Sequence, residues 1–230
     1  MANFKDDVSA AALLFLSFPI LFLVLWAVAP PTPANLLASD PLIQLVAGHA
    51  GLWAIPVLSS LPALAWISLS PPSRSSVARA GCAALGGVGV AALGLLLLRL
   101  GAGPTLPDFV PPEESARAGI TLGVGAGIVE EAVFRLGLLA SAFLLARRVL
   151  PPPWAGVLAV VTTALAFAWS HEIGPGAGPF NAHFFATRFV VPGCLMSLLF
   201  FRPGPSFLVT LHCSAHVGIA LLFRGAPPSA

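Results

Sequence analysis

Seven long apolar stretches follow one another along the chain, separated by short polar or proline-rich segments. A bilayer core about 30 Å thick needs about 20 mostly apolar helical residues to cross it. The pattern therefore predicts membrane-spanning helices near residues 9–29, 42–69, 81–100, 118–146, 154–171, 184–201 and 206–223. The expected fold class is all-α, a polytopic transmembrane helical bundle of about seven spans. We expect residues 1–230 to form a single integral membrane domain.

Composition agrees with this pattern. Hydrophobic residues make up 57% of the chain and charged residues only 9%, whereas roughly a quarter of a soluble domain is charged. A soluble domain and a nucleic-acid-binding protein are therefore excluded. The three cysteines, Cys82, Cys194 and Cys213, lie in or near apolar runs without a Cys-x-x-Cys spacing, so a disulfide scaffold is not expected either.

The distribution of positive charge predicts the orientation in the membrane. The first apolar stretch lacks a positively charged leader, so we expect an uncleaved helix. Cytoplasmic loops carry an excess of lysine and arginine. With the N-terminus inside, six positive residues lie on the cytoplasmic side and four on the other: Lys5, Arg74, Arg79, Arg147, Arg148 and Arg202 against Arg99, Arg117, Arg188 and Arg224. This balance favours a multi-pass protein of a bacterial-type inner (plasma) membrane with a cytoplasmic N-terminus.

The fourth predicted span contains three charged residues, Glu130, Glu131 and Arg135. Each charge inside a span costs about 2.5–3.5 kcal/mol on insertion scales, so such residues are functional candidates. Glu131 and Arg135 are four residues apart, the spacing of an ion pair on one helix face. Adjacent helical residues point about 100° apart, so the two glutamates are not expected to point at one spot, and Glu130 is expected to face a cavity. The alternative is a buried pair that only fixes helix packing.

His171 ends the fifth predicted span and is expected at the level of Glu130. Glu130 lies 17 residues before Arg147, and His171 lies 17 residues after Trp154. Both helices leave the same loop, so both residues lie roughly 25 Å from it. Phe167 is four residues before His171 and is expected to pack against its ring. A histidine at the membrane interface is the alternative.

The seventh predicted span contains His212 and His216, four residues apart on one helix face. This spacing suits zinc ligation or two hydrogen-bond donors aimed at one oxygen, and histidines bonded to nearby carbonyls are the alternative. Counted from Pro205, His212 lies only about 10 Å into the span, which is shallower than Glu130. Either the turn over residues 202–206 lies within the membrane, or the limits of the last two spans are wrong.

These three motifs, in this order, resemble those of the CPBP family. The family comprises type II CAAX prenyl endopeptidases together with bacteriocin-processing and immunity proteins. The resemblance covers residues 115–223, whereas residues 1–112 are not diagnostic. The family usually has asparagine, sometimes aspartate, at the position of His216. The segment Phe185-Ala186-Thr187-Arg188-Phe189 is compatible with a myxosortase-type branch, and Arg188 is a weak candidate for substrate binding.

The resemblance implies an intramembrane glutamic endopeptidase that needs no cofactor and acts on a membrane-embedded protein or lipidated peptide. Glu130 and His171 would activate water, and His212 and His216 would form the oxyanion site. Supporting roles would fall to three residues: Glu131, Arg135 and Phe167.

Three alternatives remain at this point. A zinc-dependent protease would use His171, His212 and His216 as ligands, with Glu130 beside them. A proton-coupled transporter would use the same groups as a relay, although the sequence has no detectable internal repeat. A non-catalytic immunity protein would have retained the motifs without the activity.

Overall fold

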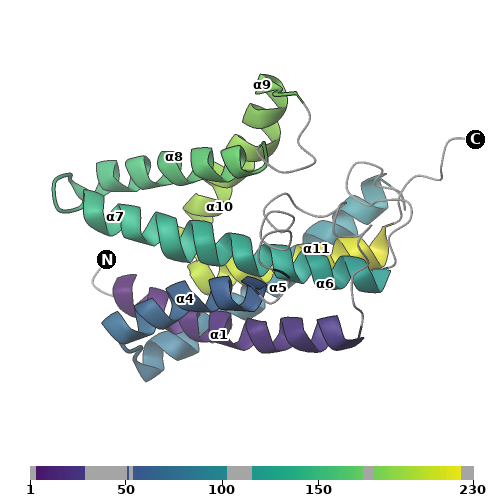
Figure 1. Cartoon of the computed structure of the whole chain (residues 1–230), viewed down its shortest axis with the longest axis horizontal. Helices are drawn as coiled ribbons and strands as arrows, with labels where there is room; N and C mark the ends of the chain where they lie inside the picture. Colours follow the sequence, from purple (N-terminus) through teal and green to yellow (C-terminus); the bar gives the residue numbers. More distant parts are fainter. Residues whose placement is uncertain (1–3, 29–50, 52–53, 103–115, 173–178, 224–230) are drawn as a thin grey trace, which may run out of the picture.

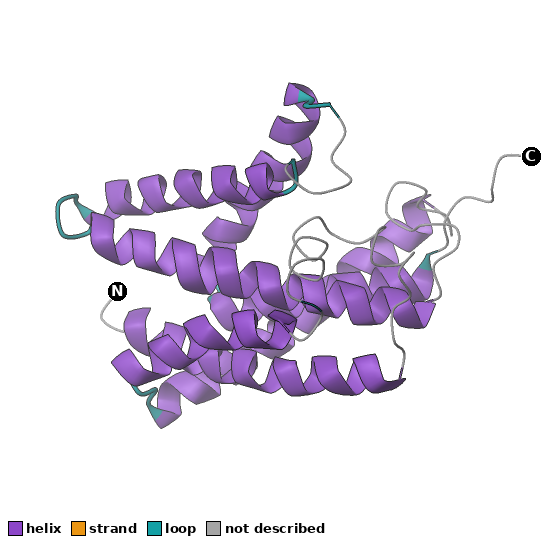
Figure 2. Ribbon diagram, in the orientation of Figure 1, coloured by secondary structure: helices purple, strands orange, loops and turns teal. Residues whose placement is uncertain are grey.

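The computed structural model describes residues 4–28, 51, 54–102, 116–172 and 179–223, and within these residues every regular element is a helix (Figure 2). The elements are α1 (Phe4–Val28), α4 (Ala54–Leu69), α5 (Arg74–Ala102), α6 (Ala116–Glu130), the π-helix η1 (Glu131–Leu139), α7 (Ala140–Ala146), α8 (Pro152–Ser170), α9 (Ala182–Phe184), the π-helix η2 (Phe185–Val190), α10 (Val191–Phe201) and α11 (Pro205–Leu222). The predicted all-α class is confirmed.

The helices coincide with the predicted spans. The fourth span corresponds to one uninterrupted helical run from α6 through η1 to α7, and the sixth to the run from α9 to α10. For the second span, α4 supplies the second half, while residues 42–50, 52 and 53 lie outside the described residues. Four helices in the described part of the chain, α1, α5, α8 and α11, are long and apolar enough to cross a membrane.

The outer faces of the helices are apolar, as lipid contact requires. On α5 the exposed side chains include Leu85, Leu93, Leu97 and Leu100, which are 58–75% exposed. A soluble monomer rarely exposes such a continuous apolar surface. Together with the long apolar helices, this surface identifies an integral membrane protein.

The long run from α6 to α7 crosses the middle of the molecule, and α8 returns along α7 (Figure 1). On the other side α1 packs against α4, and α4 also contacts η1. The last helix, α11, packs against both α5 and α6. Residues from the fourth, fifth and seventh predicted spans are thereby brought towards η1.

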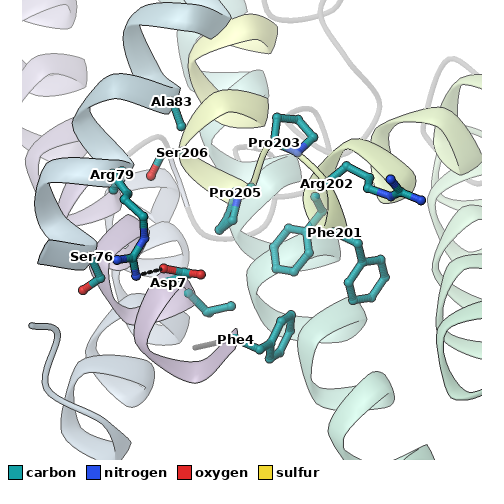
Figure 3. Close-up of a pocket in the computed structure, with 14 residues that line it drawn as sticks. Phe4, Asp7, Ser76, Arg79, Ala83, Phe201, Arg202, Pro203, Pro205 and Ser206 are labelled. Atoms are coloured by element: carbon teal, nitrogen blue, oxygen red, sulfur yellow. Dashed lines mark hydrogen bonds and ion pairs between the residues drawn. The ribbon is translucent and has the colours of Figure 1, made fainter. Parts of the chain in front are cut away.

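The α10–α11 turn lies beside the end of α7. Phe201, at the end of α10, has its ring centroid 4.9 Å from that of Phe143, which lies one turn before the end of α7. The turn therefore lies inside the level of the α7–α8 turn (Figure 1), next to the ion pair of Asp7 and Arg79 (2.6 Å) that joins α1 to α5 (Figure 3). Gly204 has φ +103° in this turn, a value that favours glycine. Spans six and seven were predicted at 184–201 and 206–223, and the corresponding helices run from Ala182 to Phe201 and from Pro205 to Leu222.

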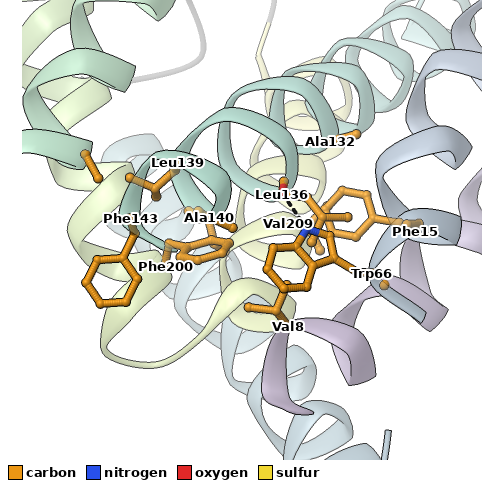
Figure 4. Packing of buried hydrophobic residues seen from close by; sticks show 14 of the residues in the cluster. Val8, Phe15, Trp66, Ala132, Leu136, Leu139, Ala140, Phe143, Phe200 and Val209 are labelled. Carbon is orange, nitrogen blue, oxygen red and sulfur yellow. Dashed lines mark hydrogen bonds between the residues drawn. The ribbon is translucent and has the colours of Figure 1, made fainter. Parts of the chain in front are cut away.

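A buried tryptophan ties α4 to the π-helix. Trp66 is 5% exposed and donates its indole N–H to the carbonyl oxygen of Leu136 in η1, at 2.8 Å (Figure 4). The carbonyl of Trp66 in turn accepts a hydrogen bond from the Ser9 hydroxyl on α1 (3.0 Å). Because a π-helix is rare, this side-chain bond to its backbone is a specific support for η1.

Replacing Trp66 with phenylalanine is expected to lower the free energy of unfolding by about 1–2 kcal/mol, because a buried hydrogen bond and part of a ring are lost. SDS titration of the purified protein in detergent measures this. The matched control is Trp154→Phe, since Trp154 is 65% exposed, and it should change little. Equal stability of the two variants would contradict the role assigned to Trp66.

Candidate active site

Two carboxylates and a guanidinium are buried where α6 becomes η1. Glu130 is the last residue of α6 and Glu131 the first of η1. Glu130 is 4% exposed, and Glu131 and Arg135 are each 1% exposed. They lie in the interior of a helical run whose other buried positions are apolar or small. Buried charges are tolerated only when they are paired, so the neighbours of these groups define the site.

His212 contacts both glutamates. Its Nδ1 lies 2.8 Å from Glu131 Oε1, within hydrogen-bond length, and its Nε2 lies 3.8 Å from Glu130 Oε2. The two glutamates thus approach different nitrogens of the same ring, because an imidazole carries nitrogens on two sides.

His216 extends this contact by one more ring. Its Nε2 lies 3.1 Å from His212 Nε2, and the two rings are stacked with centroids 4.9 Å apart. The spacing of four residues on α11 places them on one face, as expected. Glu130, Glu131, His212 and His216 thus form one connected cluster.

Arg135 pairs with Glu131 and stacks on an aromatic ring. The Nε of Arg135 is 3.7 Å from Glu131 Oε2, which confirms the predicted same-face pair. The guanidinium carbon lies 4.4 Å from the ring centroid of Phe167, a cation–π contact. Within the described residues its three nitrogens have no hydrogen-bond partner, so the carboxylate and the ring are the contacts that hold it.

Phe167 connects Arg135 to His171. The rings of Phe167 and His171 are 4.6 Å apart, which confirms the predicted packing. Because α8 runs antiparallel to η1 and Phe167 packs beside Phe134 (5.4 Å), His171, one turn later, lies at the level of Glu130 and Glu131.

The hydrogen bond of His171 determines its tautomer. His171 Nδ1 lies 2.8 Å from the carbonyl oxygen of Phe167. Since a carbonyl only accepts, Nδ1 carries the hydrogen, and in the neutral ring Nε2 keeps its lone pair. His171 can therefore accept a hydrogen bond from a water molecule.

The close approach of α6 to α11 depends on two glycines that sequence reasoning missed. A Cβ atom on Gly123 would lie 2.7 Å from His216 Cβ, and one on Gly127 would lie 3.1 Å from Cys213 Sγ. The sequence indicates this contact by the spacing of the two glycines, because small residues four apart let two membrane helices approach closely. Both glycines are needed for α11 to bring its histidines up to the glutamates.

Arg188 lies in η2, and its side chain is outside the described part of the structure. Among the described residues, no group of three histidine, cysteine, aspartate or glutamate side chains is arranged to hold a metal ion.

The helices thus bring two buried carboxylates and two partly buried histidines together, and such residues within membrane spans are candidates for a functional site. Residues 112–218, which include every candidate catalytic residue, match the family model described as type II CAAX prenyl endopeptidase Rce1-like. The chain therefore contains an Rce1-like domain, as the resemblance to CPBP proteins predicted. Comparisons with curated proteins and with solved structures found no significant match.

At the level of the family, this match supports an intramembrane CAAX-type endopeptidase domain over residues 112–218. Such a protease acts on a protein substrate that is membrane-embedded or prenylated.

Replacing Gly123 with alanine is expected to lower the free energy of unfolding by about 1–3 kcal/mol, the usual cost of overpacking. The new methyl group would collide with His216. Gly89→Ala is the control, because nothing lies within 4 Å of the position that its methyl group would take, and alanine favours a helix. Unfolding in detergent, followed for both variants, measures the difference. A Gly123→Ala protein as stable as the control would disprove the tight contact.

Proposed function

We propose that this protein is an intramembrane glutamic endopeptidase in which Glu130 activates a water molecule. The observation that carries the proposal is the buried cluster in which His212 lies 2.8 Å from one glutamate and 3.8 Å from the other, inside an Rce1-like domain. Hydrolysis of a peptide bond within a membrane needs a base, a place for water and donors for the developing negative charge. The cluster contains side chains suited to each of these tasks.

The reaction begins with water held between Glu130 and His171. Glu130 takes a proton from this water as its oxygen attacks the carbonyl carbon of the scissile bond. The lone pair on His171 Nε2, left by the bond of Nδ1 to the Phe167 carbonyl, accepts the second water hydrogen and orients the attack. When the C–N bond breaks, Glu130 returns its proton to the leaving amine.

The histidines of α11 complete the site. As the carbonyl carbon becomes tetrahedral, its oxygen acquires negative charge, and the His212–His216 pair stabilises it by hydrogen bonding. One such donor is typically worth about 3 kcal/mol of barrier. Glu131, Arg135 and Phe167 hold the cluster together through the contacts described above.

In the proposed reaction, side chains rather than a zinc ion activate the water molecule. A histidine that binds zinc directs a nitrogen lone pair at the metal. Here His212 Nδ1 faces Glu131, and its Nε2 lies 3.1 Å from His216. Both nitrogens are therefore engaged with other side chains, and a zinc site built from His171, His212 and His216 would require this pair to separate.

The substrates we propose are exported proteins with a C-terminal membrane helix. With a cytoplasmic N-terminus, the turn after α7 faces the cytoplasm, and Glu130 lies about 25 Å from it, towards the outer leaflet. A site at that depth favours an exported substrate over a cytoplasmic prenylated one. Removal of C-terminal sorting helices in a bacterial-type inner membrane fits this placement.

Glu130→Gln and His171→Ala should each reduce cleavage at least about 10²-fold, the usual contribution of an acid–base group, without lowering expression. Cleavage of a reporter protein with a C-terminal membrane helix by protein in liposomes, and proteomics of the host membrane for proteins that retain their C-terminal helix, provide two readouts. Glu172→Gln is the control, because Glu172 follows α8 and is partly exposed. Near-normal processing by either catalytic variant would refute the proposal, and full biological function of Glu130→Gln would favour a non-catalytic protein.

Cleavage should continue after incubation with a strong chelator, because no step of the proposed reaction uses a metal. Activity of the purified protein is measured before and after chelation, with metal content determined in parallel. Loss of activity that added zinc restores would establish the metal-dependent alternative instead.

A further inference from the structure

A small pocket lies at the end of the bundle where α1 and α5 begin and α10 is followed by α11. Its volume is about 230 Å³, and its lining includes Asp7 on α1, Arg79 on α5, Arg202 after α10 and Ser206 on α11 (Figure 3). None of the candidate catalytic residues is among the described residues that line it. The pocket is therefore a second polar feature of the molecule, separate from the buried glutamates.

The first turn of α11 begins at this pocket with unpaired backbone donors. Pro205 has no N–H, and the N–H of Leu208 donates to the carbonyl oxygen of Gly204 (3.2 Å). Between them, the N–H groups of Ser206 and Phe207 have no acceptor among the described residues, because Gly204 at the N-cap has no side chain to offer one. Free N–H groups at the start of a long helix, together with its dipole, favour an anion.

A buried hydroxyl in the same turn is a second, independent sign of a ligand. Ser206 is 2% exposed, and its Oγ has no hydrogen-bond partner among the described residues. Figure 3 shows Ser206 on the side of α11 that faces Arg79 of α5. A buried hydroxyl without a partner costs free energy, and a ligand in the pocket that accepts a hydrogen bond would remove this cost.

The charges of the lining also suit an anion. Two arginines and one aspartate leave one positive charge in excess. Arg79 donates to the Asp7 carboxylate through Nη2 (2.6 Å), and a guanidinium has five N–H donors, so donors remain for a second acceptor. Asp7 would repel an anion, but Arg79 pairs with it, and the exposed Arg202 adds positive charge at the rim.

We propose that this pocket binds a phosphate group through the N–H groups of Ser206 and Phe207, the Ser206 hydroxyl and the Arg79 guanidinium. A phosphate group carries negative charge and several acceptor oxygens, and so it matches a set of neighbouring donors. The pocket lies at the ends of α1, α5 and α11, three helices long enough to cross a membrane, where lipid headgroups lie. An anionic phospholipid is therefore the source of phosphate that the position favours, and free phosphate is the other.

Binding at this pocket would stabilise the helix that carries the histidines of the candidate active site. An anion at the start of α11 satisfies its free N–H groups and its dipole, and the pocket also joins α11 to α1 and α5. His212 and His216 lie further along the same helix. The inference concerns binding and stability, and it does not depend on the proposed function.

Thermal unfolding of the delipidated full-length protein in dodecylmaltoside tests the ligand class, because the rise in melting temperature with ligand concentration gives the affinity. The probes are dioleoylphosphatidylglycerol, dioleoylglycerol, which has the same chains without phosphate, and inorganic phosphate. The phospholipid should raise the melting temperature and dioleoylglycerol should not. An equal effect of inorganic phosphate would identify free phosphate as a sufficient ligand, whereas an effect of the phospholipid alone would identify the lipid. Equal stabilisation by dioleoylglycerol, or by none of the three probes, would overturn the proposal.

Ser206→Ala tests the buried hydroxyl. It should lower the affinity for the phospholipid at least about tenfold, because a hydrogen bond to a charged group is lost. It should not lower the melting temperature of the ligand-free protein, because the hydroxyl has no partner there. The control is Ser197→Ala on α10, a buried serine whose hydroxyl donates to the Gly193 carbonyl (2.8 Å), and it should keep the full affinity. Equal affinities of the two variants would overturn the site.

Arg79→Gln tests the guanidinium. It should also lower the affinity at least about tenfold, since a charged donor to the phosphate is lost. Each variant is compared with its own ligand-free form, so the loss of the ion pair with Asp7 does not enter the affinity. Arg99→Gln is the control, because it removes the same charge at the other end of α5. Equal affinities of these two variants would show that only the overall charge matters and would overturn the role assigned to Arg79.

Discussion

The burial of charge in the middle of the longest helical run is the constraint on which the site depends. Three charged residues are buried in this run: Glu130, Glu131 and Arg135. Burying each charge without a partner would cost free energy. The partners come from two other helices. Phe167 of α8 covers the guanidinium, and His212 of α11 bridges the carboxylates. Helices distant in sequence are thus held together by the same contacts that create the chemistry.

The helices themselves were predictable from hydropathy. Span five was predicted at 154–171 and is found at Pro152–Ser170, and span seven was predicted at 206–223 and is found at Pro205–Leu222. Apolar stretches of this length have one stable form in a bilayer, since only helices satisfy their own backbone. The ion pair of Glu131 with Arg135 and the packing of Phe167 on His171 were predictable for a related reason, because each pair is local, four residues apart within a helix or between a helix and the residue that caps it.

Features that depend on contacts between helices were not predictable. The bond from Trp66 to the backbone of η1 involves residues 70 positions apart, and nothing local in the sequence indicates a π-helix there. The contact of Phe143 on α7 with Phe201 on α10 likewise joins residues of different helices. Helical spacing alone also did not indicate that the ring of His212 lies close to both glutamates. The sequence motif identified the right side chains but not which of their atoms meet.

The π-helix also has a geometric consequence for the helical run that contains it. A π-turn closes its hydrogen bond one residue later than an α-turn, so the faces of α6 and α7 do not continue one another as they would in a single α-helix. On α6, Gly123 and Gly127 face α11, whereas Phe143 on α7 meets the ring at the end of α10. Each half therefore packs against its own partner helix. Deleting one residue within η1 would restore a regular α-helix and remove this difference in orientation between α6 and α7. One orientation of the helix could then not satisfy both the contacts of the glutamates and the contact between α7 and α10.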